Sequence, residues 1–417
     1  MGLSSSSPRR ARAPGRGPPP LPSVGGAGGM SARCRSRRAP SRCRARGLGT
    51  GYTPSPMPFP HFRGRFRLMA TALVTAVQLP PVLWLCVRTR TPLPALVALG
   101  LSWPYLRQFQ SPWQTPPRSR TTTLALGWWC ACLVFAVLMF PAVLAIRAGA
   151  PDGVTWGLVG ALSLVLGCDA VLGWPRLRRR TVRIAGLAPG LDGYRIGQLS
   201  DVHCGPQVPE ARVAAWVKRL NALDLDLVTV TGDLITHGPS HVEAVARGLG
   251  GLRAKDGAFV CMGNHDYFTD GEHLVRALER HGLTVLRNRG VVMARREAPL
   301  YVAGVDDTWT SRHDLPRALA ARPEGVPTVL LAHDPDLFPQ AQAHGVELTL
   351  SGHTHGGQLG VPGVRRWSLA RFITRWTAGL YRQGRSWLYV SRGAGTTGPP
   401  VRLGAPAELA VITLRRA

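Results

Sequence analysis

The stretch Arg195-Ile196-Gly197-Gln198-Leu199-Ser200-Asp201-Val202-His203 is a short apolar segment that ends in an acid and a histidine. Four later segments also carry polar side chains directly after an apolar run: Leu227–Asp233, Ala258–Asp266, Thr328–Asp334 and Leu348–His355. Runs this rich in Val, Leu and Ile are typical of strands that are buried on both faces. Because ligands of open α/β sheets bind beyond the carboxyl ends of the strands, we expect these polar side chains to meet at one rim.

From about residue 181 onward, short apolar strands alternate with amphipathic helices. We predict strands at Arg195–Leu199, Leu227–Thr231, Ala258–Met262, Leu300–Val305, Thr328–Ala332, Leu348–Leu350, Trp387–Val390 and Leu409–Leu414. One intervening helix has Pro209 in its first turn and a single apolar stripe, formed by Val213, Trp216, Val217 and Leu220. The alternation predicts an α/β sandwich with central sheets and outer helices.

The polar groups at the five strand ends are carboxylates, imidazoles and one amide. They belong to Asp201, His203, Asp233, Asn264, His333, His353 and His355. One such group has an ordinary explanation, and Asp233 alone would serve as a helix N-cap. Seven groups with mixed nitrogen and oxygen chemistry indicate divalent transition metals rather than calcium. We also expect His353 and His355, which lie two residues apart on a segment taken as extended, to point to different sides and reach two different ions.

Taken together, the spacings D-x-H, G-D, G-N-H-D, H and G-H-T-H resemble those of the calcineurin-like metallophosphoesterase family. The resemblance covers about residues 185–414, and no ligand position of the family pattern is missing. It implies a four-layer sandwich in which two central mixed sheets are flanked by helices. It also implies a first ion held by Asp201, His203, Asp233 and His355. Asp233 would bridge to a second ion, whose ligands would be Asp233, Asn264, His333 and His353.

Three segments narrow the resemblance to one branch of the family: Leu199–His203, Leu350–Gln358 and Ser391–Gly398. They look like the membrane-anchored bacterial phosphodiesterases, which are similar in turn to UDP-diacylglucosamine pyrophosphohydrolases of the lipid A pathway. This branch also has vertebrate relatives with several membrane spans before the same domain. The resemblance therefore implies an enzyme that hydrolyses a phosphodiester or pyrophosphate bond.

The family likeness implies the chemistry as well. Two divalent ions, of Mn, Fe, Zn or Ni, would activate a bridging hydroxide that attacks phosphorus and would offset the charge on the phosphoryl oxygens. The leaving alkoxide needs a proton, for which His265 is the candidate acid, with Asp266 as the group that orients its imidazole. A purely structural hydrogen bond is the alternative role for His265.

Other residues near the strand ends have both functional and structural interpretations. The backbone of Gly356-Gly357 can approach a phosphate closely, and the Arg392 side chain could pair with one, although a structural role fits Arg392 equally well. Asp306 and Asp307 follow a predicted strand and offer a further pair of acids. We interpret this pair as capping or loop residues, because the ligand set is already complete.

The net charge of +28 is concentrated in the first half of the chain. Residues 1–67 hold 14 Arg and no acid, with many Pro, Gly and Ser, and such a composition cannot bury enough apolar surface to fold. We predict a disordered tail whose charge holds a membrane protein in the positive-inside orientation. Nucleic acid is not an expected partner, because no recognised binding module follows the tail.

Four apolar runs follow the tail, at 68–87, 92–106, 123–146 and 154–174. The third is long enough to cross about 30 Å of hydrocarbon, whereas the second is short. By the positive-inside rule, four spans would place the C-terminal half in the cytoplasm, and three would place it outside. We favour four spans in the cell (inner) membrane. The predicted domains are a tail at 1–67, a multi-pass membrane region at 68–175 and a cytoplasmic metallophosphoesterase domain at 176–417.

Residues 365–385 mix aromatic and aliphatic side chains with Arg, a composition that fits either a membrane surface or a lid packed over the core. Together with the predicted spans, this stretch favours a lipid-linked phosphate ester as the substrate. Two other functions stay open, a tethered phosphatase or cyclic-nucleotide phosphodiesterase with a soluble substrate and a non-enzymatic membrane scaffold. The complete ligand set argues against the scaffold. The sequence does not indicate an oligomeric state.

Overall fold

The computed structural model describes residues 89–108, 174–236, 238–268, 270–295, 297–360, 368–398 and 402–417, with short pieces and single positions between 72 and 157. The predicted tail at 1–67 lies outside the described residues, as does most of the predicted membrane region. Helix α2, at Leu93–Gln108, covers most of the apolar run at 92–106. Among the described residues, no helix is both long enough and apolar enough to cross a membrane.

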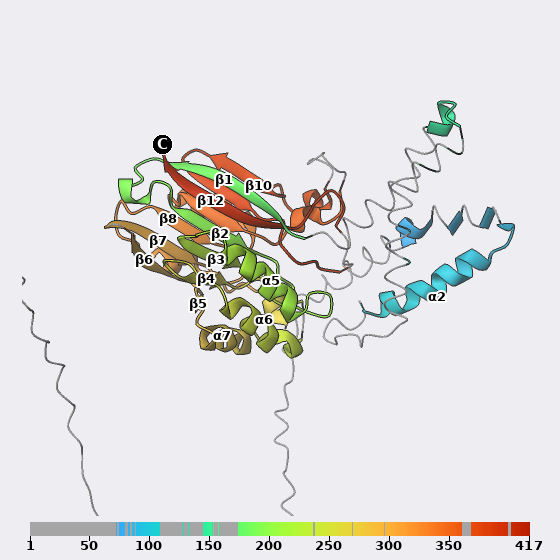
Figure 1. The fold of residues 1–417 in the computed structure, drawn as a ribbon, viewed down its shortest axis with the longest axis horizontal. Helices are drawn as coiled ribbons and strands as arrows, with labels where there is room; N and C mark the ends of the chain where they lie inside the picture. Colours follow the sequence, from blue (N-terminus) through green and yellow to red (C-terminus); the bar gives the residue numbers. More distant parts are fainter. Residues whose placement is uncertain are drawn as a thin grey trace, which may run out of the picture. The chain divides into compact units, whose positions relative to one another are not determined.

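The C-terminal half contains two mixed six-stranded sheets (Figure 1). The first has the order β1-β12-β2-β3-β4-β5, from Arg176–Ile184, Glu408–Arg416, Arg195–Leu199, Leu227–Thr231, Ala258–Cys261 and Thr284–Val285. Strands β2 to β5 are parallel to one another, whereas β12 runs antiparallel to β2 and parallel to β1. The carboxyl ends of β2, β3 and β4 therefore lie at the same edge.

The second sheet has the order β10-β11-β9-β8-β7-β6, from Gly379–Gln383, Ser386–Val390, Leu348–Ser351, Thr328–Leu331, Ala298–Gly304 and Arg289–Arg295. Its four central strands are parallel, and the edge strands β10 and β6 each run antiparallel to their neighbour. Strands β8 and β9 therefore also end together. Because all five motif-bearing strands lie in parallel parts of their sheets, each sheet brings its motifs to a single edge.

Helices cover the outer face of each sheet. The first sheet packs against α5 (Glu210–Asn221), α6 (Val242–Gly250) and α7 (Gly271–Arg280), and the second against α8 (Leu315–Leu319) and α9 (Phe338–Ala343). A separate apolar core lies between the two sheets. The layers are therefore helices, sheet, sheet and helices, in the predicted order. Short 3-10 helices occur at Pro189–Leu191, Pro239–His241, Asn264–Phe268, Pro335–Leu337, His355–Gly357 and Leu369–Phe372.

Strand β12 shows how the sequence produces these layers. Successive side chains of a strand point to opposite faces of its sheet. Leu409 and Val411 accordingly join the core beneath the helices, whereas Ala410, Ile412 and Leu414 join the core between the sheets. An uninterrupted apolar run thus fills two cores at once. Helix α5 follows its predicted pattern, because its four predicted apolar positions are all buried.

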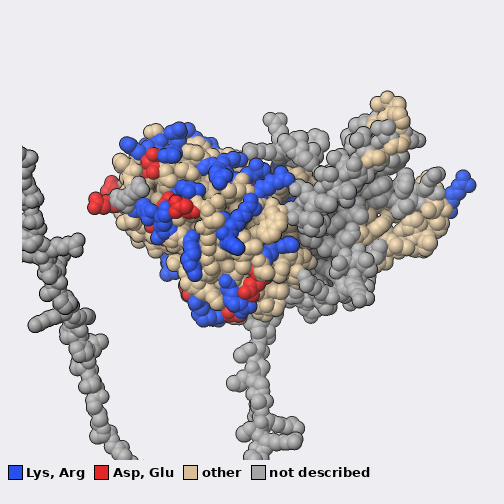
Figure 2. Space-filling view, viewed as in Figure 1, with Lys and Arg blue, Asp and Glu red and all other residues tan. Residues whose placement is uncertain are grey.

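All eight predicted strands are present, with ends that shift by at most a few residues. Strands β1, β5, β6 and β10 were not predicted. β1 carries five Arg in nine residues, so it lacks the apolar run that indicated the other strands. Charged side chains are tolerated in a strand at the edge of a sheet, because one side of it remains in water. Lys and Arg gather over the face that carries β1 and β12, with only small patches of Asp and Glu between them (Figure 2).

Leu350→Ala should leave a cavity between the sheets, because Leu350 is fully buried in the core that both sheets share. Such substitutions cost about 2–5 kcal/mol of unfolding free energy, so we expect the thermal unfolding midpoint to fall by roughly 4–20 °C. The control is Val292→Ala on edge strand β6, where the side chain is 48% exposed and the cost should stay within about 0.5 kcal/mol. Equal midpoints for the two variants would contradict the shared core.

Candidate metal centre

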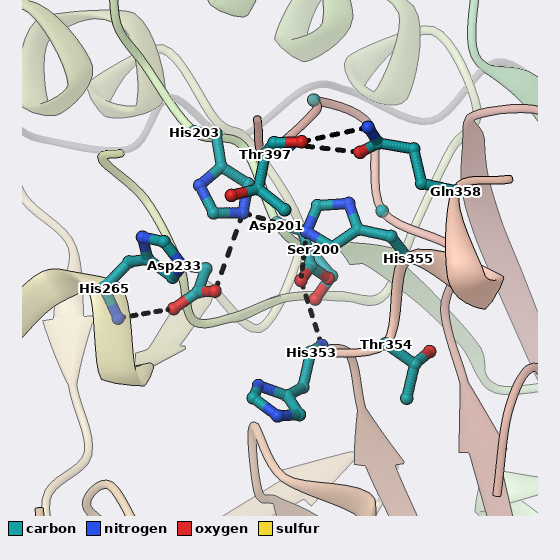
Figure 3. A network of polar contacts seen from close by, with 12 residues as sticks. Ser200, Asp201, His203, Asp233, His265, His353, Thr354, His355, Gln358 and Thr397 are labelled. Carbon is teal, nitrogen blue, oxygen red and sulfur yellow. Dashed lines mark hydrogen bonds and ion pairs between the residues drawn. The ribbon is translucent and has the colours of Figure 1, made fainter. Parts of the chain in front are cut away.

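The carboxyl ends of the two sheets meet, and Figure 3 shows the predicted ligands Asp201, His203, Asp233, His353 and His355 at this junction. Two contacts join the sheets there. The His333 Nδ1 atom, after β8, lies 2.7 Å from the carbonyl oxygen of Thr231 at the end of β3. The backbone N–H of His353, after β9, donates to Asp201 Oδ1, after β2, at 2.9 Å. The five strand ends therefore lie together, as expected, and both sheets contribute to them.

One group of four buried side chains can hold a metal ion, and its members are Asp201, His203, Asp233 and His355. The ligand atoms of this group all lie within 4.8 Å of one another. His203 and His355 point toward each other, with their Nε2 atoms 2.9 Å apart and their rings nearly parallel (Figure 3). Asp233 Oδ2 lies 3.6 Å from His203 Nε2, and Asp201 Oδ1 lies 3.4 Å from His355 Nε2. Two carboxylates and two imidazoles thus converge on one point.

A second group shares Asp233 with the first and adds His333 and His353. Asp233 Oδ2 lies 3.2 Å from His333 Nε2, which is 3.3 Å from His353 Nδ1. Asn264 belongs to the same cluster, because its Oδ1 lies 3.0 Å from His353 Nδ1. All seven predicted ligands therefore come together, and they divide into the two groups that the family resemblance implied.

The backbone at the site is strained. Five of the seven residues have positive φ angles, namely Asp201 (50°), His203 (48°), Asp233 (53°), His353 (70°) and His355 (50°). Residues other than glycine rarely adopt this left-handed conformation, which costs about 1–3 kcal/mol each and is concentrated at functional sites. The prediction of an extended segment at 353–355 was therefore wrong. His353 and His355 do reach different groups, but they do so through a tight turn that leads into a 3-10 helix, whereas residues two apart on an extended segment would share a face.

The donor set and its burial fit divalent cations. Asp201 is fully buried, and its Oδ2 atom has no hydrogen-bond partner among the described residues. Burial raises the pKa of Asp201 to about 6, because the ionised carboxylate loses its contact with water. A bound cation would stabilise the ionised form and lower this pKa. Burial also holds the pKa values of His203 and His355 well below the ordinary range. Both imidazoles are therefore neutral, which is the form that binds metals.

His265 lies beside the first group without joining it. Its backbone N–H donates to Asp233 Oδ1 at 2.9 Å, and its ring centroid lies 4.8 Å from that of His203. The partner of its Nδ1 atom is the carbonyl oxygen of Thr236, at 2.8 Å. Asp266 does not contact this imidazole, contrary to our expectation. Its buried carboxylate instead accepts the backbone N–H groups of Gly263, Leu234 and Ile235, so it fixes the loops that follow β3 and β4.

Comparison with known proteins identifies the family. A model of the calcineurin-like phosphoesterase family matches residues 194–357. The zebrafish (Danio rerio) transmembrane protein with metallophosphoesterase domain is 32% identical over 257 residues, which is 58% of this chain and 58% of that protein. The uncharacterized metallophosphoesterase YkuE of Bacillus subtilis is 30% identical over 239 residues, which is 56% of this chain and 84% of YkuE. The chain belongs to the calcineurin-like metallophosphoesterase family.

The predicted family is thereby confirmed. An uncharacterized metallophosphoesterase of Aquifex aeolicus is also similar, at 31% identity over 248 residues, which is 58% of this chain and 92% of that protein. The family residues Asp201, His203, Asp233 and His355 support the binding of a divalent metal.

A glycine-rich loop at Ser391–Gly398 supports the first ligand group of this metallophosphoesterase. The backbone N–H groups of Ala394 and Gly395 donate to the carbonyl oxygens of Ser200 and Asp201, at 2.9 and 2.8 Å. Gly393 has a φ of +72°, and a Cβ atom there would collide with the Asp201 side chain. The loop therefore packs its backbone directly against the strand end that presents Asp201.

Two further residues, Arg402 and Glu408, also hold the first ligand group and the loop beside it. Both are buried and charged, and the sequence analysis did not single them out. Arg402 Nη2 lies 3.1 Å from His355 Nδ1, and its Nη1 atom donates to the His355 carbonyl oxygen at 3.3 Å. Glu408, fully buried, accepts hydrogen bonds from Arg392 Nη1 at 2.6 Å and from the Tyr389 hydroxyl at 2.7 Å. Arg392 thus pairs with a carboxylate of its own chain, which favours the structural interpretation. In the sequence, only the glycine-rich composition of Ser391–Gly398 indicated that this loop packs closely against the site.

The acid pair after β7 has the expected structural contacts. Asp306 accepts hydrogen bonds from Arg287 Nε at 2.8 Å and from the hydroxyl of Tyr267. Asp307 Oδ2 accepts the backbone N–H of Thr310 at 2.7 Å, which caps the loop that follows β7. Asp306 and Asp307 therefore make structural contacts at the loop after β7, which fits the capping or loop role interpreted from the sequence.

Gly352→Ala should displace the first ligand group, because a Cβ atom at this position would collide with the Ser200 hydroxyl and the Asp201 carboxylate. We expect metal affinity to fall by about 10–100-fold, as happens when groups that orient metal ligands are lost. The loss of affinity is measured as the metal content that remains after dialysis, determined by mass spectrometry. Gly251→Ala is the control, because its added Cβ would meet nothing closer than Val217 Cγ1 at 3.4 Å. Wild-type metal content in Gly352→Ala would show that the close approach is not required.

Proposed function

We propose that the chain is a membrane-anchored phosphoesterase that uses two divalent metal ions to hydrolyse a phosphodiester or pyrophosphate bond. The observation that carries this is the sharing of Asp233 between two ligand groups, since the same Oδ2 atom lies 3.6 Å from His203 Nε2 and 3.2 Å from His333 Nε2. When bound, two ions would supply positive charge to the phosphoryl group and lower the pKa of an attacking water.

The chain's own residues would hold and separate the two ions. Asp201, His203 and His355 belong to the first, and Asn264, His333 and His353 to the second, with Asp233 between them. The strained backbone and the glycine-rich loop hold these side chains in place before a substrate binds. Such preorganisation matters because groups that are already aimed at developing charge need no reorganisation during the reaction.

His265 is the proposed proton donor to the leaving group. Its Nδ1–H donates to the carbonyl oxygen of Thr236, so a ring that also carries a proton on Nε2 is an imidazolium, and this second proton is the one that the departing alkoxide would take. Because its backbone N–H binds the carboxylate of the shared Asp233, the ring position is tied to the metal centre. Asp266 would contribute by fixing the loops on which Asp233 and His265 stand.

Membrane anchoring is supported by the apolar runs between residues 68 and 174 and by the name of the zebrafish relative. We propose that these runs cross the cell (inner) membrane and that the catalytic domain lies in the cytoplasm. Such a location would give the metal centre access to lipid-linked phosphate esters. A soluble phosphate ester or cyclic nucleotide is the alternative substrate class. The chain matches 58% of the zebrafish relative's length.

Asp233→Asn should abolish catalysis, because the amide removes the charge that both ligand groups share. With purified full-length protein and added Mn²⁺, we expect hydrolysis of bis(p-nitrophenyl) phosphate to fall by roughly 10³-fold, equivalent to about 4 kcal/mol of transition-state stabilisation. Asp224→Asn is the control, since Asp224 is exposed and paired with Lys255. Metal-independent turnover in the wild type, or full turnover in Asp233→Asn, would exclude the proposed function.

His265→Ala should keep its metals and lose turnover by roughly 10²–10⁴-fold, the usual contribution of a general acid. The matched control is His344→Ala, because the His344 Nδ1 atom likewise lies 2.9 Å from a backbone carbonyl oxygen, that of Gln340, whereas His344 is exposed and belongs to neither ligand group. Steady-state kinetics and metal analysis of both variants are the measurements. A His265→Ala enzyme with normal turnover would instead indicate the structural role.

A further inference from the structure

Phe372 is the most exposed large apolar side chain among the described residues, with 88% of its surface in contact with solvent. Its neighbour Ile373 is 61% exposed. Elsewhere in the described residues after 173, only Trp174 and Val292 are large apolar side chains with comparable exposure. Isolated exposed apolar residues are ordinary on protein surfaces, but adjacent ones on a fixed turn indicate an interaction site.

The turn that carries Phe372 and Ile373 is held on both sides. The Ser368 hydroxyl, just before the 3-10 helix η6 (Leu369–Phe372), donates to the carbonyl oxygen of Gly356 at 2.8 Å. The Thr374 hydroxyl, just after Ile373, donates to Asp336 Oδ1 at 2.5 Å. The two apolar side chains are therefore displayed in a defined position rather than left on a loose loop.

The surroundings of the turn are basic. Arg371 and Arg375 are both exposed, and the Arg375 guanidinium lies 4.5 Å from the centre of the Trp376 ring. No Asp or Glu occurs in the sequence between Glu347 and Glu408, whereas eight Arg do. The acid in contact with the turn is Asp336, whose carboxylate already accepts the Thr374 hydroxyl. An anionic partner therefore meets little repulsion here.

The turn is also attached to the metal centre. Gly356, which accepts the Ser368 hydroxyl, directly follows His355 in the sequence. On the other side of the turn, the Thr354 hydroxyl donates to the carbonyl oxygen of Thr377 at 2.6 Å. Residues on both sides of the turn are thus bonded to the segment that carries His353 and His355. A surface bound by the turn would lie beside the site.

An anionic lipid surface fits these features better than a protein partner does. Apolar side chains flanked by Arg bind membranes because the apolar groups enter the boundary between headgroups and acyl chains while the Arg pair with phosphates. A stable protein interface needs about 800 Å² on each partner, which two adjacent side chains do not supply. A small soluble phosphate would make no use of Phe372 or Ile373.

We propose that residues 368–375, here called the apolar turn, bind the surface of an anionic bilayer and hold the metal centre against it. The substrate class would then be a phosphoester carried by a lipid. Delivery of such a substrate rests on the proposed phosphoesterase function, whereas binding of the lipid surface does not. The two can therefore fail independently.

Site-specific photo-cross-linking tests the lipid contact in the full-length chain. Benzoylphenylalanine replaces Phe372 or, as the control, Val292, and each protein is reconstituted into nanodiscs of phosphatidylcholine with phosphatidylglycerol. We expect at least about tenfold more lipid adduct at position 372, and a loss of at least about fivefold when phosphatidylglycerol is omitted, because each Arg near an anionic surface contributes about fivefold in affinity. Equal adducts at both positions, or adducts to protein instead of lipid, would overturn the lipid contact.

A pair of chromogenic esters tests delivery. The double substitution Phe372→Ser, Ile373→Ser should leave hydrolysis of soluble bis(p-nitrophenyl) phosphate unchanged, since neither side chain belongs to the metal centre. Hydrolysis of hexadecyl p-nitrophenyl phosphate in the nanodiscs should fall by about tenfold or more, because the apolar contribution to surface binding is lost. Equal loss on both esters, or no loss on either, would overturn delivery. A wild-type chain without metal-dependent turnover would contradict the phosphoesterase function while leaving the cross-linking comparison intact.

Discussion

The burial of two carboxylates, Asp201 and Asp233, is the constraint on which the rest of the site depends. Both are almost fully removed from water, and an ionised carboxylate in such a place costs several kcal/mol unless opposite charge and hydrogen bonds offset it. The protein supplies backbone N–H groups from His353 and His265 to one oxygen of each. The other oxygens face imidazoles or have no hydrogen-bond partner among the described residues. Bound cations would offset the remaining charge of these carboxylates, and His203 and His355, whose pKa values are held well below the ordinary range by burial, are in the neutral form that binds metals.

Much of the architecture follows from patterns that the sequence displays openly. Continuous apolar runs predicted the four central strands of each sheet, because strands buried on both faces have no polar alternation to obscure them. Polar residues directly after those runs predicted seven side chains that the structure brings close together. What made this possible is simple geometry, since parallel strands deliver their ends to one edge whatever the connections between them.

The parts that escaped prediction are those in which local sequence and structure disagree. Strand β1 is dominated by Arg and is stabilised by its pairing with β12, which is far away in the sequence. The left-handed conformations of Asp201 and His355 oppose local preference and persist because contacts from distant residues hold them. Asp266 lies next to His265 in the chain yet bonds to other loops, because a 3-10 helix separates the directions of adjacent side chains. In each case the deciding contact comes from a residue that no local pattern identifies.

The pairing of β1 with β12 has a consequence for how the protein is made. β12 is the last strand of the described chain, yet in the first sheet it lies between β1 and β2, which are the first two. A ribosome synthesises those early strands long before the one that joins them. Until β12 emerges, β1 and β2 both lack the strand to which their backbones bond, and Glu408 is not yet present to bind Arg392 near the metal centre. Assembly of the candidate metal centre is therefore delayed until β12 has been translated.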